Sequence, residues 1–169
     1  MKTIIISLGV ACVFAVAAHG QDVTKATCKL EPKSGSKVEG MITLTKTGNE
    51  VQVVGDITGL TPGKHGFHVH EKGDCSAPDA ASAGAHFSVG QHKHGGPTTS
   101  ERHEGDLGNI EADASGKAHI DWKGKMNFSG ADSVIGKSLV VHEKEDDLKT
   151  DPSGNSGARQ ACGVIEAAK

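Results

Sequence analysis

Histidines recur in several short segments between residues 66 and 144, and with one aspartate they form a set that could hold two metal ions in one site. Imidazole nitrogen is a borderline-soft donor that suits zinc, copper, iron or nickel, whereas calcium and magnesium prefer carboxylate and carbonyl oxygens. A transition metal is therefore indicated. The candidate donors are His68, His70, His86, His94, His103, Asp106 and His142.

The spacing of these donors indicates which elements carry them. His68 and His70 are separated by one residue, and in an extended strand that spacing turns both rings to one face and Val69 to the other. The next donors lie in residues 86–106, where Gly, Ser and Pro are frequent, so this stretch is expected to be a loop that folds over the strand. His142 ends the apolar run LVVH and is expected on a distant strand.

The rest of the sequence predicts an all-β fold. The chain has 23 glycines, 3% aromatic residues and short β-branched runs separated by turn dipeptides, a pattern that favours many strands over helices. Residues 71–105 and 143–159 interrupt the regular strand spacing, and loops of this length are usually functional. Eight strands predict a β-sandwich or flattened barrel, with expected bounds 24–31, 38–46, 51–58, 64–70, 106–112, 117–123, 138–142 and 160–166.

Length and composition indicate one exported domain. The 169 residues suit a single core. Lys2 is the only charge before Asp22, and residues 4–18 are mostly small and apolar, which predicts a signal peptide over residues 1–20. The alternative of an uncleaved membrane anchor is disfavoured because the apolar run is shorter than the roughly 20 residues of a span. The mature domain, residues 21–169, is expected to be secreted, extracellular or periplasmic, with no stable membrane span.

Export would place Cys28, Cys75 and Cys162 in an oxidising compartment, where one intramolecular pair can form. Their number alone does not settle which two pair. A bond between Cys75 and Cys162 would tie the loop before His86 to the last strand. Cys28 lies in an alternating run and is expected to be a buried, inert thiol. The formal charge of −3 argues against nucleic acid as a partner.

Several segments, in order along essentially the whole mature chain, resemble the copper/zinc superoxide dismutases. They are GFHVHEKGD (66–74), SAGAHF (82–87), KHGGP (93–97), ERHEGDLGN (101–109), VVHEKEDDL (140–148) and GNSGARQACGVI (154–165). An ordered set of this kind is much more specific than one short motif. The resemblance implies a Greek-key β-barrel. It also implies an antioxidant enzyme that converts superoxide to dioxygen and hydrogen peroxide by alternately reducing and oxidising bound copper, beside a zinc ion.

The same resemblance implies the metal ligands, one copper ion and one zinc ion per chain. His86 would bridge the two ions, which makes chemical sense because an imidazole that loses its second proton offers two nitrogens, and two dications lower the cost of that loss. Copper would be held by His68, His70, His86 and His142, and zinc by His86, His94, His103 and Asp106.

Further roles are implied by position in these motifs. Arg159 matches an arginine beside copper that docks the anion, so Arg159 and His86 are the expected catalytic residues. Asp146 matches an aspartate that links His68 to His94. The disulfide implied is Cys75–Cys162. Because the chain is net negative, attraction of superoxide is expected to be local, with Lys149 a weaker candidate beside Arg159. Three further histidines are not assigned to metal, and His119 is expected at the surface: His65, His92 and His119.

Two other classes of function compete with the enzyme. An exported protein that sequesters copper or zinc would use the same donor cluster without turnover, and a structural β-domain would use metals only to stiffen its loops. Arg159 and the full copper set favour the enzyme. Lys72 and Glu166 fall where the animal cytosolic dimer has apolar contacts, so either a homodimer of different arrangement or a monomer is expected.

Overall fold

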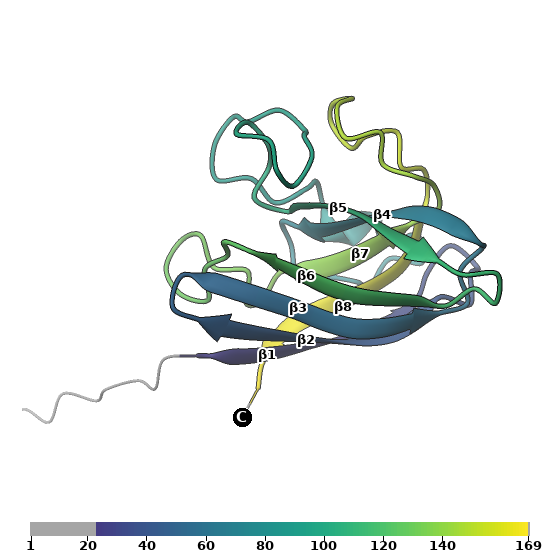
Figure 1. Cartoon of the computed structure of the whole chain (residues 1–169), viewed down its shortest axis with the longest axis horizontal. Coiled ribbons are helices and arrows are strands. Elements are labelled where there is room, and N and C mark those ends of the chain that lie inside the picture. Colours follow the sequence, from purple (N-terminus) through teal and green to yellow (C-terminus); the bar gives the residue numbers. More distant parts are fainter. Residues whose placement is uncertain (1–22, 169) are drawn as a thin grey trace, which may run out of the picture.

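The computed structural model describes residues 23–168, and the expected signal peptide over residues 1–20 lies outside them. Eight strands form one antiparallel sheet in the order β5-β4-β7-β8-β1-β2-β3-β6 (Figure 1). The all-β prediction is confirmed, and each strand lies within one residue of its expected bounds. The strands are β1 (Lys25–Pro32), β2 (Glu39–Thr47), β3 (Glu50–Thr58), β4 (Gly63–His70), β5 (Asp106–Ala112), β6 (Ala118–Gly124), β7 (Ser138–His142) and β8 (Arg159–Ala167).

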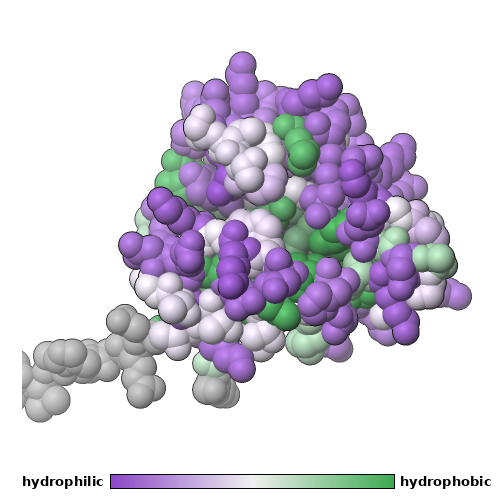
Figure 2. Space-filling model, in the orientation of Figure 1, coloured by the Kyte–Doolittle hydropathy of each residue, from purple (hydrophilic) through white to green (hydrophobic). Residues whose placement is uncertain are grey.

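The sheet curls into a nearly closed, flattened barrel with Greek-key connections. β3 pairs with β2 and β6, while β4 pairs with β5 and β7, so the chain crosses between the two halves after β3, after β5 and again after β6. A cavity of about 220 Å³ between β5 and β6 is lined by apolar side chains such as Phe67 and Ile120 and by polar ones such as Asn109 and His119. Figure 2 shows this side of the molecule as mostly polar, with apolar side chains gathered in a central hollow.

Alternation along the strands forms the core. In β1 the side chains of Ala26, Cys28 and Leu30 are buried, while Lys29 and Glu31 between and beside them are exposed, as the two-residue period of a half-buried strand requires. Strands β4 and β7 differ, because nearly every residue in them is buried. These two strands are covered on both faces, by the core and by the long loops, and they carry His68, His70 and His142.

The two long loops lie on the same side of the barrel (Figure 1) and attach to β4 by backbone hydrogen bonds. The first loop pairs with the end of β4 where Phe87 donates to the Val69 carbonyl at 2.8 Å and Val69 donates to the Gly105 carbonyl at 2.9 Å. The second loop is held where Gly66 donates to the Lys144 carbonyl at 2.8 Å. A short 3-10 helix, η1 (Ala81–Ala83), is the one helical element of residues 23–168. No helix in that range has the length and apolar character needed to cross a membrane.

Candidate metal centre

Strands β4 and β7 bring three of the predicted donors together beneath the loops. His68 and His70 lie on β4, whose neighbour β7 places Val140 opposite His68 and ends at His142. His86 reaches the same point because the chain around it bridges back to His70. The donor atoms of these buried residues lie within 4.8 Å of one another, and so do those of a second group that shares His86. The groups are His68, His70, His86 and His142, and His86, His94, His103 and Asp106.

The first group has ring nitrogens that face one another, and two of them lack a hydrogen-bond partner among residues 23–168. Nε2 of His70 lies 3.3 Å from Nε2 of His142, while Nδ1 of His68 and Nε2 of His86 are buried and have no hydrogen-bond partner in the part of the chain that the structure describes. Buried polar atoms are normally satisfied, and each exception calls for an explanation. A metal ion that accepts all of these lone pairs explains them, and a purely imidazole set suits copper.

The second group is built around one carboxylate. Nδ1 of His86, His94 and His103 lies 2.8, 3.1 and 3.3 Å from Oδ1 of Asp106. The other oxygen of Asp106 accepts hydrogen bonds from the backbone N–H groups of Gly95 and His103, at 3.0 and 2.9 Å, which aims Oδ1 at the rings. Three imidazoles and one carboxylate form a closed donor set of the kind that zinc takes.

His86 is shared, with one nitrogen in each group. Its Nδ1 belongs to the Asp106 group, and its Nε2 is the unpartnered atom on the side of His70 and His142. The rings of His86 and His68 are 4.0 Å apart between centroids and tilted by 36°. The residues present therefore fit two neighbouring metal ions joined through one imidazole.

A second layer of hydrogen bonds fixes the outer nitrogens of the donor rings. Asp146, which is fully buried, contacts Nε2 of His68 and Nε2 of His94, each at 2.8 Å. Asn109 on β5 holds the backbone of Asp146 from both sides, since its amide donates to the Asp146 carbonyl at 2.8 Å and accepts from the Asp146 N–H at 2.7 Å. Such partners set the tautomer and orientation of each ring. Sequence reasoning missed Asn109, although it stands in the quoted segment ERHEGDLGN.

Burial and hydrogen bonding give several of the seven donor residues the protonation states that metal ligands need. Burial lowers the pKa of His86 to about 4, against the opposing effect of its bond to Asp106, and burial also holds the pKa values of His70 and His142 well below the usual range. Burial alone would raise the pKa of Asp106, but hydrogen bonds from His86 and His94 lower it. Neutral rings and an ionised carboxylate are the metal-binding forms.

His94 is the exception. Burial disfavours its charged form, yet its hydrogen bonds with Asp106 and Asp146 together raise its pKa to about 9. Without metal, the ring of His94 therefore holds a proton between two carboxylates at neutral pH, and a zinc ion would replace that proton.

The first group opens to the surface. A cavity of about 390 Å³ reaches His70, His86 and His142, and Arg159 lies in its wall. The guanidinium of Arg159 donates to the carbonyl of Ala80 at 2.7 Å and to that of Gly84 at 2.6 Å. Because both acceptors are neutral, the guanidinium is fixed in place while no carboxylate of residues 23–168 forms an ion pair with it. A small anion entering the cavity would meet this charge beside the histidines.

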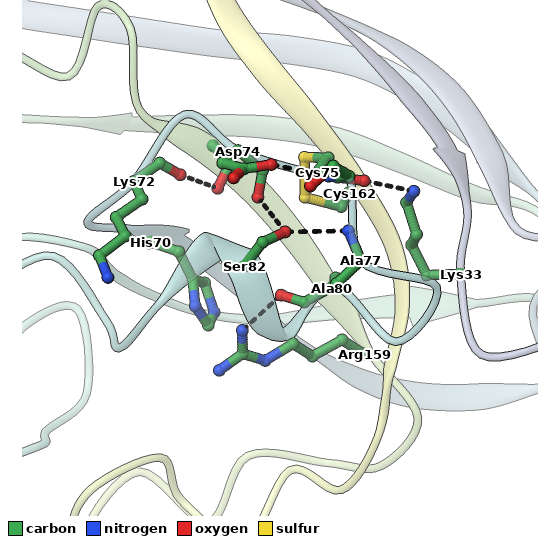
Figure 3. The surroundings of a disulfide bond; sticks show 12 residues. Lys33, His70, Lys72, Asp74, Cys75, Ala77, Ala80, Ser82, Arg159 and Cys162 are labelled. Carbon is green, nitrogen blue, oxygen red and sulfur yellow. Dashed lines mark hydrogen bonds between the residues drawn. A yellow bond between two sulfur atoms is a disulfide. The ribbon is translucent and has the colours of Figure 1, made fainter.

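A disulfide braces the loop that holds Arg159 (Figure 3). The predicted bond between Cys75 and Cys162 is confirmed, with the two Cα atoms 5.7 Å apart. Ser82 in η1 donates to the Asp74 carbonyl at 2.8 Å and accepts from the Ala77 N–H at 3.1 Å. The disulfide thus ties the loop before His86 to β8, the strand that begins at Arg159.

Outside the two groups, the remaining titratable residues lie mostly where their sequence context indicated. His65 is buried, with Nδ1 2.8 Å from the His142 carbonyl, and His119 is exposed beside Asp56 on the neighbouring strand. Cys28 is buried, which raises its pKa to about 12. The side chains of His92, Lys72 and Glu166 are also exposed.

The fold and the site together define a β-barrel metalloprotein with a two-metal centre, one side of which is open to a small anion. A family model for copper/zinc superoxide dismutase matches residues 38–165. The extracellular Cu-Zn superoxide dismutase of Brugia pahangi is 47% identical over 138 residues, which cover 76% of this chain and 69% of that protein. The Cu-Zn superoxide dismutase of Onchocerca volvulus is 46% identical over 143 residues, covering 78% of this chain and 90% of that protein.

A solved structure has the same fold as this chain. The crystal structure of the clock protein EA4 superposes with a TM-score of 0.82 at 39% sequence identity, covering 90% of this chain and 100% of that one. The chain therefore belongs to the copper/zinc superoxide dismutase family. It is an oxidoreductase of that class, with copper and zinc as its cofactors.

Proposed function

We propose that the shared imidazole of His86 is the centre of the reaction by which this chain converts superoxide to dioxygen and hydrogen peroxide. The observation that carries this proposal is the asymmetry of the site. Nδ1 of His86 faces the closed group around Asp106, while its unpartnered Nε2 faces the group that opens into the cavity beside Arg159. A centre with one closed and one open side suits a structural ion next to a reactive one.

The donor sets assign the two metals. The all-histidine group would hold copper, and the group with the carboxylate would hold zinc. When bound, copper supplies the alternating one-electron exchange and zinc supplies charge without changing its oxidation state. The copper ligands would be His68, His70, His86 and His142, and the zinc ligands would be His86, His94, His103 and Asp106, which are the two groups that the fold brings together.

The roles of the surrounding residues follow from their contacts. Arg159 binds the incoming anion, because its charge is permanent and its two carbonyl contacts hold it in the cavity wall. Nε2 of His86 is the atom that can hold or release a proton next to the reacting anion, since its other nitrogen is fixed by Asp106. Asp146 keeps His68 and His94 in one tautomer each, and so holds the two donor groups in a common frame.

A metal-sequestering protein would need the same donors, but it would gain nothing from the open cavity and the fixed charge of Arg159.

We place the mature chain outside the cell, because its first residues have the pattern of an export signal and the Brugia pahangi relative is named extracellular. A homodimer stays a prediction. The exposed positions of Lys72 and Glu166 favour an arrangement without a dry contact at those residues.

The test uses one purified sample loaded with both metals, a second loaded with zinc alone and a third stripped of metal. We expect one copper and one zinc per chain in the first sample, and rapid loss of superoxide only there. Binding of both metals with no acceleration of superoxide decay would contradict the proposal and support sequestration.

A further inference from the structure

The loop over residues 143–158 forms hydrogen bonds with His94 at two separate places, the ring and the backbone. Oδ1 of Asp146 contacts Nε2 of the His94 ring at 2.8 Å. Oδ1 of Asp151 accepts a hydrogen bond from the backbone N–H of His94 at 2.5 Å. One carboxylate thus fixes the ring and a second fixes the backbone of the same residue, although Asp151 itself is exposed.

The segment that presents Asp151 is a compact turn. The carboxylate of Asp147 accepts from the Thr150 N–H at 2.8 Å, from the Thr150 hydroxyl at 2.7 Å and from the Asn155 amide at 3.0 Å. The N–H of Gly154 donates to the Thr150 carbonyl at 2.7 Å. These bonds close residues 147–155 on themselves, so the position of Asp151 is coupled to that of the whole turn.

The residues that follow Asp151 directly form part of the copper-side cavity. Pro152 and Ser153 line it, in the same cavity as Arg159 and His142. The bond from Asp151 to His94 therefore joins the residue next to the rim of this cavity to the loop that carries the zinc donors. No residue that lines the cavity makes that connection by a side-chain bond to the backbone of His94.

We infer that Asp151 is a positioning residue, which fastens the rim of the anion cavity to His94 and so couples zinc occupancy to the order of the rim. The inference rests on the assignment of His94 to zinc. A zinc ion that holds the His94 ring restrains the backbone N–H that Asp151 binds, and this restrains Pro152 and Ser153. Coupling of this kind is reciprocal, so a fastened rim must also favour retention of zinc.

The magnitude follows from the type of bond. A carboxylate that accepts a backbone N–H makes a charge-assisted hydrogen bond, which is stronger than a neutral one. Removing it leaves the His94 N–H without this acceptor in a partly buried position. Loss of a partner behind a metal ligand typically lowers metal affinity by about 10- to 100-fold. Because Asp151 holds the backbone and Asp146 still holds the ring, we expect about tenfold, the lower end of that range.

The experiment compares Asp151→Ala, Asp151→Asn and the matched control Glu101→Ala with the wild-type protein, each loaded with copper and zinc. Glu101 is an exposed acid between the zinc donors His94 and His103, and its carboxylate makes no hydrogen bond among residues 23–168. The control removes one negative charge close in sequence to the zinc donors, without removing a side-chain hydrogen bond. Zinc release into a chelator is measured, together with backbone hydrogen exchange over residues 92–96 and 149–154 with zinc bound and after zinc removal.

We expect Asp151→Ala to release zinc about tenfold faster than the wild type, and Glu101→Ala to match the wild type. Asp151→Asn keeps an acceptor oxygen, so it should release zinc at an intermediate rate. In the wild type, zinc should slow hydrogen exchange over residues 149–154, and in Asp151→Ala this effect of zinc should be lost.

Wild-type zinc release by Asp151→Ala, with an unchanged effect of zinc on residues 149–154, would overturn the inference. If Asp151→Ala does not fold, Asp151→Asn decides, and a zinc release rate equal to the wild type would likewise overturn it. Neither measurement uses superoxide. A chain that binds both metals without turnover would contradict the proposed function, but the role of Asp151 in zinc retention could still be measured.

Discussion

Replacing Arg159 with Ala should slow superoxide removal without emptying either metal group. Within residues 23–168 the guanidinium donates hydrogen bonds only to the carbonyls of Ala80 and Gly84, and the Nδ1 of His70 keeps its own bond to Gly84, at 3.0 Å. The metal donors therefore lose no direct partner. What the variant loses is the fixed positive charge in the wall of the cavity.

The size of the effect can be worked from electrostatics. At about 6 Å and an effective dielectric constant of about 20, a unit charge attracts an anion by about 3 kcal/mol. Arg159 is only half-buried, so solvent and salt screen part of this energy, and about 2 kcal/mol should remain. That energy corresponds to roughly a 30-fold lower rate constant. Arg159→Lys keeps the charge but cannot contact both carbonyls, so its rate should fall between those of the wild type and the Ala variant.

The assay follows superoxide decay after a rapid pulse, with metal content measured on the same samples and ionic strength varied. Local attraction weakens with salt, so the wild-type rate should fall as ionic strength rises and the rate of Arg159→Ala should fall less steeply. Lys123→Ala is the matched control, since it removes one positive charge from an exposed residue of β6, which does not line the cavity. A fully loaded Arg159→Ala protein with the wild-type rate and salt dependence would refute the reasoning.

Three further predictions concern the frame around the centre. In Gly154→Ala, the new Cβ would lie 1.7 Å from Oδ1 of Asp146 at a backbone φ of 63°, so the carboxylate must move. Zinc per chain should fall, and full zinc content would argue against the link. In Cys75→Ser, loss of a bond that spans 87 residues should lower the free energy of unfolding in urea by about 4.5 kcal/mol, and a loss below about 1 kcal/mol would contradict this entropic account. In the metal-free protein, burial lowers the pKa of His86 to about 4. Between pH 6.5 and 4 this imidazole is therefore protonated in the unfolded chain but neutral in the folded one. Calorimetry should show the free energy of unfolding falling by about 3 kcal/mol from this group alone as the pH is lowered over that range. The pKa of His94 is raised to about 9, so its contribution to the free energy of unfolding has the opposite pH dependence. This contribution is present below about pH 6.5 and is lost as the pH rises through 9. A free energy of unfolding that does not change with pH over both ranges would contradict the protonation states given to His86 and His94.

The strands and the candidate donors were predictable from sequence because both depend on local patterns, whereas the division of the donors into two groups came from resemblance to a family. Alternation fixes which residues of β1 face inward, and the spacing of His68 and His70 fixes that both rings share a face. The pairing of Cys75 with Cys162 was not fixed by cysteine number and came only from resemblance to a family.

The contacts of Asn109 and Asp151 could not be predicted in this way. Both side chains bind the backbone of a residue far away in sequence, Asp146 for the first and His94 for the second. A hydrogen bond to a distant backbone leaves no periodic trace in the sequence, and it appears only when the loops are folded over β4. The same holds for the neutral carbonyls that hold Arg159, since any residue type can supply them.

The sharing of His86 between two metals is tested most directly by crystallography of the loaded protein, with anomalous diffraction recorded at the copper and zinc absorption edges. The account predicts one copper peak about 2.0 to 2.1 Å from Nε2 of His86 and one zinc peak at the same distance from Nδ1. A single metal peak at His86, or two peaks that do not have this ring in common, would contradict it.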